Sequence, residues 1–136
     1  MTTQSMHVTK TVFRVSDFLA WQRHKSLDLR PPFQRGSVWN PRSKSMFMDS
    51  IIKGFPIPLI FLKDETDPIT FEPHRLVVDG QQRLRTLIAF IDRSVLNKQE
   101  PGDDFTISRS HNRDSTIYGT PFQDLSGEVR SRILDF

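Results

Sequence analysis

The alternation of apolar and polar positions along the chain predicts short helices and strands separated by loops that contain proline. Residues 11–15 ("TVFRV") show the alternation typical of a strand. Ser16 is a natural N-cap, so a helix is predicted to follow it over residues 17–25. Residues 27–33 ("LDLRPPF") are predicted to be extended, because two consecutive prolines exclude a helix there.

A second helix has sequence signals at both ends. Asn40 can cap its N-terminus, Pro41 suits its first position, and Gly54 stands just beyond its last turn. The apolar residues between these signals recur at helical spacing: Phe47, Met48, Ile51 and Ile52. An almost wholly apolar run follows, and its centre at residues 59–62 ("LIFL") is predicted to be a buried strand.

The middle of the chain then passes from a strand to a helix through a very short turn. Residues 64–74 form a polar segment with two prolines, which could hold a small hairpin around "ITF". Residues 75–79 ("RLVVD") have the pattern of a strand, and residues 81–95 have that of a helix. This helix has one apolar stripe that is predicted to face the core: Leu84, Leu87, Ile88, Ile91 and Val95.

The C-terminal part is more polar and has weaker signals. A strand is predicted at residues 105–108 ("FTIS"), and Phe122 and Leu125 are predicted to be core residues. A last helix is predicted from about Gly127, capped by Ser126, to the end of the chain. Together these elements predict an α+β fold, with a small mixed sheet and flanking helices.

Composition limits the class of protein. A length of 136 residues, with 36% hydrophobic and 26% charged residues, predicts a single globular domain over residues 1–136. The last predicted helix reaches Phe136 without a stop signal, so we expect this domain to be the N-terminal part of a longer protein. No apolar run approaches membrane-spanning length and no secretory signal is visible, so we expect a cytoplasmic protein with no membrane partner. The absence of cysteine excludes disulfides, thiolate zinc sites and cysteine nucleophiles. The net charge of +3 only weakly favours a polyanionic partner.

The turn between the central strand and the third helix reads "DGQQR". In a purely structural interpretation, Asp79 caps the helix and Gln82 completes a variant of the capping box. Gly80 would then only permit a tight turn. This interpretation explains the turn without a ligand, but it leaves the arginines that follow unexplained.

Arg83 and Arg85 stand in the first turns of this helix. A helix N-terminus has a partial positive charge, which disfavours each cation there by about 0.3–1 kcal/mol. A bound anion would remove the conflict, because free backbone N–H groups, a glycine and a guanidinium together form a phosphate site. Gln81 and Gln82 would add neutral donors. The competing explanation is a salt bridge from Arg83 to Asp79 or Glu72.

A second unusual stretch is "LRPPFQRGSVWNP", at residues 29–41. Its two prolines stiffen an extended segment that presents Gln34 and Arg35 beside Phe33, an arrangement typical of recognition loops. In the structural alternative, Phe33 and Trp39 fill core space while the two polar side chains are solvated.

Three stretches in this order, "PPFQR…VW", "DSIIKGFPIPLIFL" and "LVVDGQQRLRTL", carry a family resemblance. The chain resembles, over roughly residues 12–136, the Asp-Gly-Gln-Gln-Arg branch of the ParB/sulfiredoxin superfamily. That branch forms the N-terminal domain of GmrSD-type modification-dependent restriction enzymes and of related phage-defence proteins. The resemblance implies a small mixed fold that binds, and hydrolyses, a nucleoside triphosphate (GTP or UTP) with Mg²⁺.

The resemblance also implies roles for individual residues. The phosphates would lie at Asp79, Gly80, Gln81, Gln82 and Arg83, with Gln34 and Arg35 facing the same pocket. Asp79 would contact the metal or orient the attacking water, while Arg83 and Arg35 would stabilise phosphoryl charge. Arg85 departs from the threonine common in relatives, and Gly36 and Ser37 replace bulkier residues. The implied partners are the nucleotide, modified DNA and a His-Asn-His-type nuclease domain, which is either C-terminal or separate. The resemblance is also compatible with assembly into a homo-oligomer. Nuclease activity is not expected from this chain alone.

The alternative function is a non-enzymatic module that binds DNA or senses its modification. Arg23, His24 and Lys25 cluster on a predicted helix and could contact DNA phosphates, although a solvated helix face explains them as well. The four histidines lack the spacing of a metal site. His111 and Asn112 distantly resemble a nuclease His-Asn pair and are interpreted as part of a polar loop.

Overall fold

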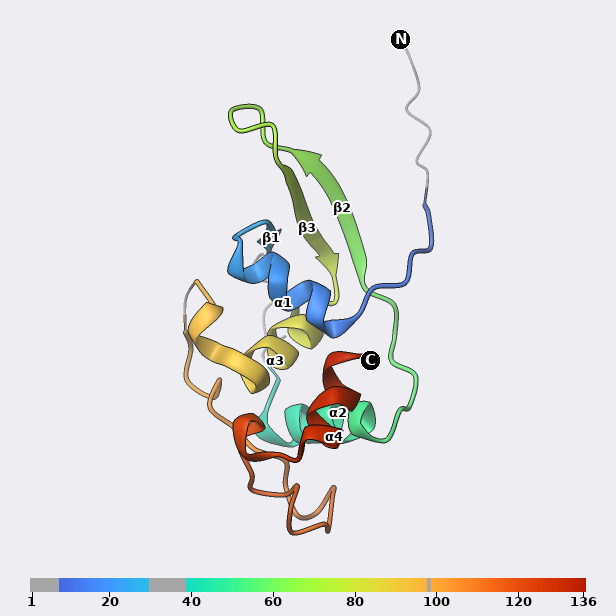
Figure 1. Ribbon diagram of the computed structural model, residues 1–136, viewed down its shortest axis with the longest axis vertical. Coiled ribbons are helices and arrows are strands. Elements are labelled where there is room, and N and C mark those ends of the chain that lie inside the picture. The colour runs from blue at the N-terminus through green and yellow to red at the C-terminus, as the bar shows by residue number, and fades with distance from the viewer. Residues whose placement is uncertain (1–7, 30–38, 98) are drawn as a thin grey trace.

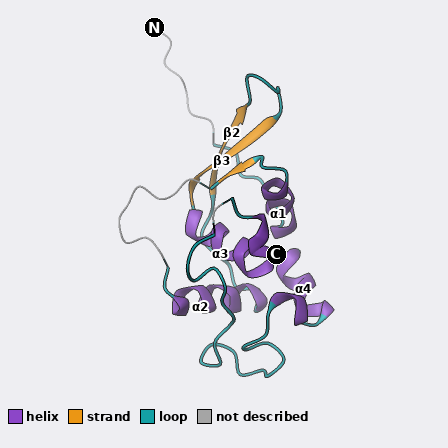
Figure 2. Ribbon diagram, turned by 90° about the vertical axis from the view of Figure 1, so that its left-hand side faces the viewer, coloured by secondary structure: helices purple, strands orange, loops and turns teal. Residues whose placement is uncertain are grey.

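The computed structural model describes residues 8–29, 39–97 and 99–136. It has a small sheet at one end and four α-helices at the other (Figures 1 and 2). This arrangement confirms the predicted α+β class. No helix in these three ranges is long and apolar enough to cross a membrane.

The sheet has three strands in the order β1-β3-β2. They are β1 (Leu27–Asp28), β2 (Phe61–Thr66) and β3 (Pro73–Asp79). β1 runs parallel to β3, with Leu27 opposite Arg75, and β2 runs antiparallel to it. The predicted strand at residues 75–79 is confirmed, and it begins two residues earlier. Because β1 and β3 are parallel, their carboxyl ends lie at the same end of the sheet.

The strand predicted at residues 59–62 is placed wrongly. β2 begins at Phe61 and extends to Thr66, into the segment predicted to be a polar loop. The hairpin expected around residues 69–71 does form, with β2 and β3 as its antiparallel strands. β2 is an edge strand of this projecting hairpin, and Leu59, just before it, is 60% exposed. Pairing with β3 decides where β2 lies, and an apolar run alone could not reveal that.

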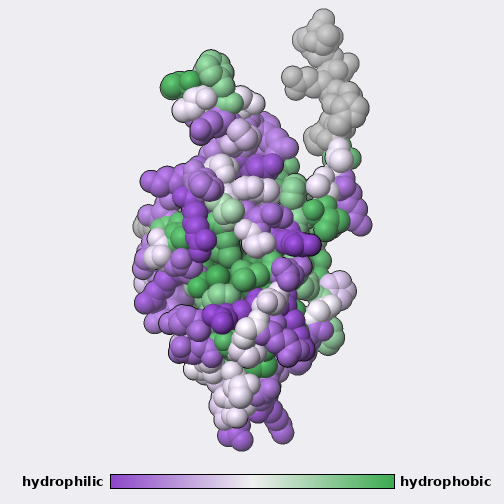
Figure 3. Space-filling view, viewed as in Figure 1, coloured by the Kyte–Doolittle hydropathy of each residue, from purple (hydrophilic) through white to green (hydrophobic). Residues whose placement is uncertain are grey.

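The hairpin ends in a turn that Asp67 organises. Its carboxylate accepts hydrogen bonds from the backbone N–H groups of Ile69 (2.8 Å) and Thr70 (3.2 Å). Phe71 takes a left-handed φ of 61°. Ile69 and Phe71 are more than three-quarters exposed, and Figure 3 shows apolar side chains at this tip.

The turn is expected to loosen in acid. The backbone hydrogen bonds from Ile69 and then Thr70 hold the pKa of Asp67 below its ordinary value of 3.8. Because the pKa of Asp67 is lower in the folded state, its hydrogen bonds stabilise the turn fully above the ordinary pKa. This stabilisation is lost as the pH falls through the lowered, folded-state pKa. An NMR pH titration should therefore show the Ile69 and Thr70 amides shifting with a midpoint below pH 3.8. Amides that titrate at or above that pH would contradict the assignment.

The N-terminal prediction is wrong in its details. Helix α1 spans Val15–Arg23, and no strand forms over residues 11–14. Arg14, not Ser16, is the N-cap, and the carboxylate of Asp17 accepts the Arg14 N–H at 2.8 Å. Val15 is buried, so packing of this residue into the core starts the helix before the serine.

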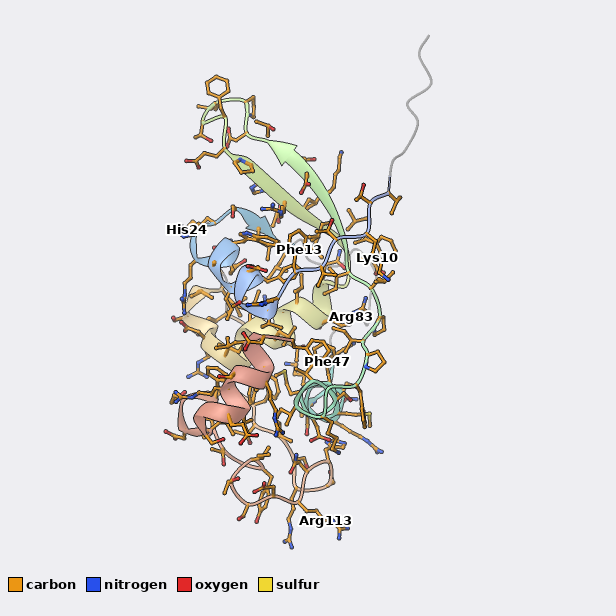
Figure 4. All side chains as sticks on the ribbon, turned by 45° about the vertical axis from the view of Figure 1, so that its right-hand side comes forward. Lys10, Phe13, His24, Phe47, Arg83 and Arg113 are labelled. Atoms are coloured by element: carbon orange, nitrogen blue, oxygen red, sulfur yellow. The ribbon has the colours of Figure 1, made fainter. Side chains whose placement is uncertain are left out.

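An aromatic cluster fastens α1 to the sheet. Phe13 and Phe18 each lie edge-on to Trp21, with centroids 4.9 Å from its ring. The guanidinium of Arg75, on β3, stacks over Trp21 at 3.9 Å from the ring centroid. Figure 4 labels Phe13 beside this contact.

The other helices follow their sequence signals closely. Helix α2 spans Pro41–Ile52, and the side chain of Asn40 caps it by accepting the Ser43 N–H at 2.8 Å. Helix α3 spans Gln81–Asp92 and continues as the 3-10 turn η1 (Arg93–Val95). Helix α4 spans Gly127–Leu134, after the 3-10 turn η2 (Phe122–Asp124), and is capped by Ser126 as predicted. It ends two residues before the predicted end.

The predicted strand at residues 105–108 is absent from the described structure. This segment is an irregular loop, although Ile107 is almost fully buried and Phe105 packs against the core. The Ile107 carbonyl accepts the Gly119 N–H at 2.9 Å, and the Ser108 carbonyl accepts the N–H groups of His111 and Asn112 in a turn. The apolar residues were recognised correctly, but the loop buries them without a partner strand.

One core joins the four helices to β1 and β3. Leu125 and the predicted apolar residues of α2 are buried, and Phe122 packs against the core, as expected. Ile91 and Val95 are partly buried, whereas the buried face of α3 is wider than the predicted stripe. The side chains that are almost completely buried are Leu27, Met48, Ile51, Val77, Leu84, Ile88, Ile107 and Ile133.

Candidate functional site at the start of helix α3

The "DGQQR" turn joins the end of β3 directly to the start of α3. Asp79 is the last residue of the strand, and Gly80 is the N-cap, with a left-handed φ of 100°. Among the described residues, no side chain caps this helix. The predicted Asp79 cap and capping box are therefore wrong, because the left-handed glycine turns the chain after Asp79 and leaves that residue in the strand. The first N–H groups of α3 have no side-chain cap from this part of the chain.

Gly80 is also required by close packing. A Cβ at this position would lie 2.9 Å from Cγ1 of Ile60 and 3.2 Å from Nη2 of Arg83. The first distance is shorter than real Cβ contacts allow. The turn thus has room for a backbone and not for a side chain, which keeps Ile60 and Arg83 against the helix start.

Arg83 lies at the base of the sheet, beside the chain that leads into β2 (Figure 4). Its Nη2 donates to the Leu59 carbonyl at 2.8 Å, and the nearest carboxylate oxygen with which it pairs, on Asp79, is 4.0 Å away. The side chain is only 17% exposed, whereas that of Asp79 is 66% exposed. Its Nε is buried and has no hydrogen-bond partner in the described structure.

These contacts bear on the two explanations for Arg83, a bound anion and a salt bridge to Asp79 or Glu72. Glu72 lies at the opposite end of β3, so the salt bridge to it does not form. The pairing with Asp79 is at the outer distance limit of an ion pair and its carboxylate is largely exposed to solvent, so it compensates the charge of the mostly buried guanidinium only weakly. The bond to Leu59 explains the position of the side chain, but it does not compensate its charge.

The two glutamines make different contacts. Nε2 of Gln81 donates to the carbonyls of Val77 and Val78, both at 3.1 Å. Oε1 of Gln82 accepts the backbone N–H of Trp39 at 3.3 Å. The first side chain therefore folds back onto β3, and the second reaches across to the segment that precedes α2.

Arg85 lies on the other flank of α3. It pairs with Asp103 at 2.8 Å and with Glu100 at 3.6 Å. The side chain of Asp103 is only 6% exposed, so this is a largely buried ion pair. A small cavity of about 10 Å³ beside it, also lined by Gln82 and Thr86, has room for about one water molecule. Arg85 is therefore part of a structural ion pair, a role that the sequence did not suggest.

Gln34 and Arg35 lie outside the described residues. The residues on either side of that segment are placed: Leu29 follows β1, and Trp39 is bonded to Gln82. Trp39 also packs edge-on against Phe47 of α2, with ring centroids 5.3 Å apart.

Comparison with protein families identifies the chain. Residues 15–133 match the model of the GmrSD restriction endonuclease N-terminal domain. The chain belongs to this family. Searches among curated proteins and among solved structures gave no significant match. Membership makes the chain a component of a restriction or defence system, as its motifs indicated.

The His-Asn pair of this GmrSD-type domain has a structural role. Nδ1 of His111 bonds to Oγ of Ser45 at 2.6 Å, and Nδ2 of Asn112 donates to the carboxylate of Asp49 at 2.7 Å. Ser45 and Asp49 are buried on α2. Oγ of Ser45 also accepts the Ser108 N–H, so the contacts dock the loop onto α2. The interpretation of this segment as a polar loop is therefore supported.

The remaining candidate groups are scattered. Arg23 lies 3.8 Å from Asp92, so its charge is partly matched within the domain. Lys25 takes a left-handed φ of 57° in the turn after α1. In the described ranges, no three histidine, aspartate or glutamate side chains are grouped as metal ligands.

Proposed function

We propose that this domain binds a nucleoside triphosphate at the "DGQQR" turn, with the phosphates against the N-terminus of α3. The observation on which this depends is the state of Arg83. Its guanidinium is mostly buried at the positive end of a helix, its pairing with Asp79 is only at 4.0 Å, and its Nε has no partner in the described structure. A polyphosphate beside the helix start would supply the missing charge.

The donors around this turn suit an anion with several oxygen atoms. The helix start has no side-chain cap among the described residues, and Gly80 leaves only backbone there. Gln34 and Arg35 would complete the site from the segment that ends at Trp39. The cavity of about 10 Å³ beside Gln82 is far too small for a nucleotide, so the proposed pocket requires this segment as its second wall.

A single protein carboxylate is consistent with an Mg²⁺ ion that is held mainly by the phosphates of a bound nucleotide. Asp79 is exposed at the end of β3 and is free of the capping role. Mg²⁺ typically keeps several waters and binds through one or two carboxylates together with substrate phosphates. When bound, it would neutralise charge on adjacent phosphates. Asp79 is therefore the proposed metal contact, or the group that orients the attacking water.

Hydrolysis of GTP or UTP is the reaction proposed for this site. The oxygen of a water molecule would attack the terminal phosphorus, and the bond to the bridging oxygen would break to release a nucleoside diphosphate and phosphate. Arg83 and Arg35 would stabilise charge on the phosphoryl oxygens. In the whole protein, we propose that this step controls a His-Asn-His-type nuclease domain that acts on modified DNA, with assembly into a homo-oligomer as one means of control.

Isothermal titration of the purified chain with GTP, UTP, CTP and ATP in Mg²⁺ tests the proposal. We expect saturable binding of at least one triphosphate, with GTP or UTP preferred. The absence of heat with all four at millimolar concentration would exclude nucleotide binding. A parallel titration with duplex DNA separates the alternative, since a DNA module would bind without nucleotide and lose affinity steeply with salt.

A further inference from the structure

We infer that the two glutamines of the turn have opposite roles: Gln82 donates to the ligand, whereas Gln81 is a positioning residue that offers it no donor. This inference rests on the proposed anion site and assigns its contacts within the motif. It departs from the expectation that both glutamines are neutral donors, and it follows from the backbone groups that each amide meets.

Gln81 has both of its N–H bonds occupied. A side-chain amide has two N–H donors, and its Nε2 faces two carbonyls, those of Val77 and Val78. Carbonyl oxygens cannot donate, so the amide cannot be reversed at this position without placing three oxygens together. The contacts join the first residue of α3 to the last residues of β3. Only Oε1 of Gln81 remains, and an oxygen acceptor repels phosphate oxygens.

Gln82 has the reverse orientation. Its Oε1 accepts the N–H of Trp39, and an N–H donor requires the oxygen of the amide, not its nitrogen. The Nε2 group therefore keeps two N–H bonds, which make no hydrogen bond within the described part of the chain. Gln82 is partly exposed and stands next to Arg83, whose buried Nε also lacks a partner.

These two unused donors belong to adjacent residues in the first turn of α3. The Nε2 group of Gln82 and the N–H groups of the helix start suit a ligand that has acceptors on neighbouring atoms, as a polyphosphate does, and Arg83 adds positive charge beside them. The bond between Gln82 and Trp39 further means that the ligand-binding amide is held by the residue that precedes Asn40, the cap of α2. Removing this bond should leave Nε2 free to rotate away.

Paired glutamate substitutions test the polarity. Both residues lie in the first turn of α3, so the helix dipole favours a carboxylate equally at either position. In Gln82→Glu an oxygen still accepts the Trp39 N–H, and we expect the melting temperature of the free protein to stay near the wild-type value. In Gln81→Glu two carboxylate oxygens face two carbonyls, and we expect a clearly lower melting temperature. The reverse order of melting temperatures would overturn the inferred polarity.

Titration with GTP and Mg²⁺ tests the roles. We expect Gln82→Glu to weaken binding at least about tenfold, because a donor becomes an anion facing phosphate. In the wild type, the side-chain NH₂ signals of Gln82 should shift on addition of GTP, while those of Gln81 should not. Unchanged affinity in Gln82→Glu, or a shift at Gln81 alone, would overturn the assigned roles. If the wild type binds no nucleotide, the proposed function fails, and with it the ligand role of Gln82.

Discussion

Gly80→Ala is expected to be the most damaging single-methyl substitution in the turn. A non-glycine residue at φ 100° is strained by about 1–3 kcal/mol. The new Cβ would also meet Ile60 Cγ1 at 2.9 Å and Arg83 Nη2 at 3.2 Å, and such overpacking typically adds about 1–3 kcal/mol. Urea unfolding should therefore show a loss of about 2–6 kcal/mol. Nucleotide binding should be lost as well, because Arg83 must move.

Gly54→Ala is the matched control for this experiment. Gly54 also has a left-handed φ, of 75°, but a Cβ there would meet no atom within 4 Å. It should therefore show only the backbone strain and bind nucleotide as the wild type does. Equal losses of stability in the two variants would mean that the contact with Ile60 does not matter. Retained binding in Gly80→Ala would contradict the proposed role of the turn.

Substitutions at Arg83 and Arg85 are expected to have opposite effects, the first mainly on nucleotide binding and the second mainly on the free energy of unfolding. Arg83→Met removes the bond to Leu59 and a long pairing with the exposed Asp79 carboxylate, so the stability of this variant should fall by only about 1 kcal/mol. Nucleotide binding should become undetectable, because a guanidinium that contacts phosphate is gone. Arg85→Met leaves the largely buried Asp103 carboxylate without its partner, and the loss of stability should be about 3–5 kcal/mol.

The measurement for this pair is urea unfolding together with titration by GTP and Mg²⁺ under native conditions. The folded fraction of Arg85→Met should still bind, since that arginine is engaged by carboxylates on the far flank of α3. A variant at Arg85 that loses binding while remaining folded would show that this arginine contacts phosphate. Normal binding by Arg83→Met would remove the main support for the anion site.

The elements predicted well from sequence are those whose signals are local. The ends of α2 and the start of α4 are set by side chains that bond to backbone only a few residues away, as Asn40 and Ser126 do. The central strand and α3 were found because their apolar patterns are long. Helix α1 was misplaced because burial of Val15 in the core prevailed over the local preference for a Ser16 cap.

The elements predicted poorly depend on partners that are distant in sequence. Residues 59–62 look like a core strand, yet β2 begins at Phe61 because it pairs with β3 in an edge hairpin. The segment at residues 105–108 has the apolar residues of a strand, but it packs onto the helices as a loop. Hydrophobic pattern identifies what is buried more reliably than the backbone form that buries it.

The candidate site shows the same division. The sequence located the turn, the glycine and the unusual arginine. It did not show that the N-cap of α3 is Gly80 and not Asp79. Both residue types are acceptable caps, and only the left-handed backbone at Gly80 decides which one takes the position. Nor could the sequence separate the two glutamines, since the contact that orients Gln82 comes from Trp39, far away in the sequence.

Binding of a polyphosphate at the start of α3 is the central claim about this domain. An NMR titration of the backbone amides tests this binding most directly. On addition of GTP and Mg²⁺, the largest shifts should appear at the N–H groups of Gln81, Gln82 and Arg83, with smaller changes at Trp39. Shifts confined to Arg23 at the end of α1 and Lys25 in the turn after it, or no shifts at saturating nucleotide, would contradict it.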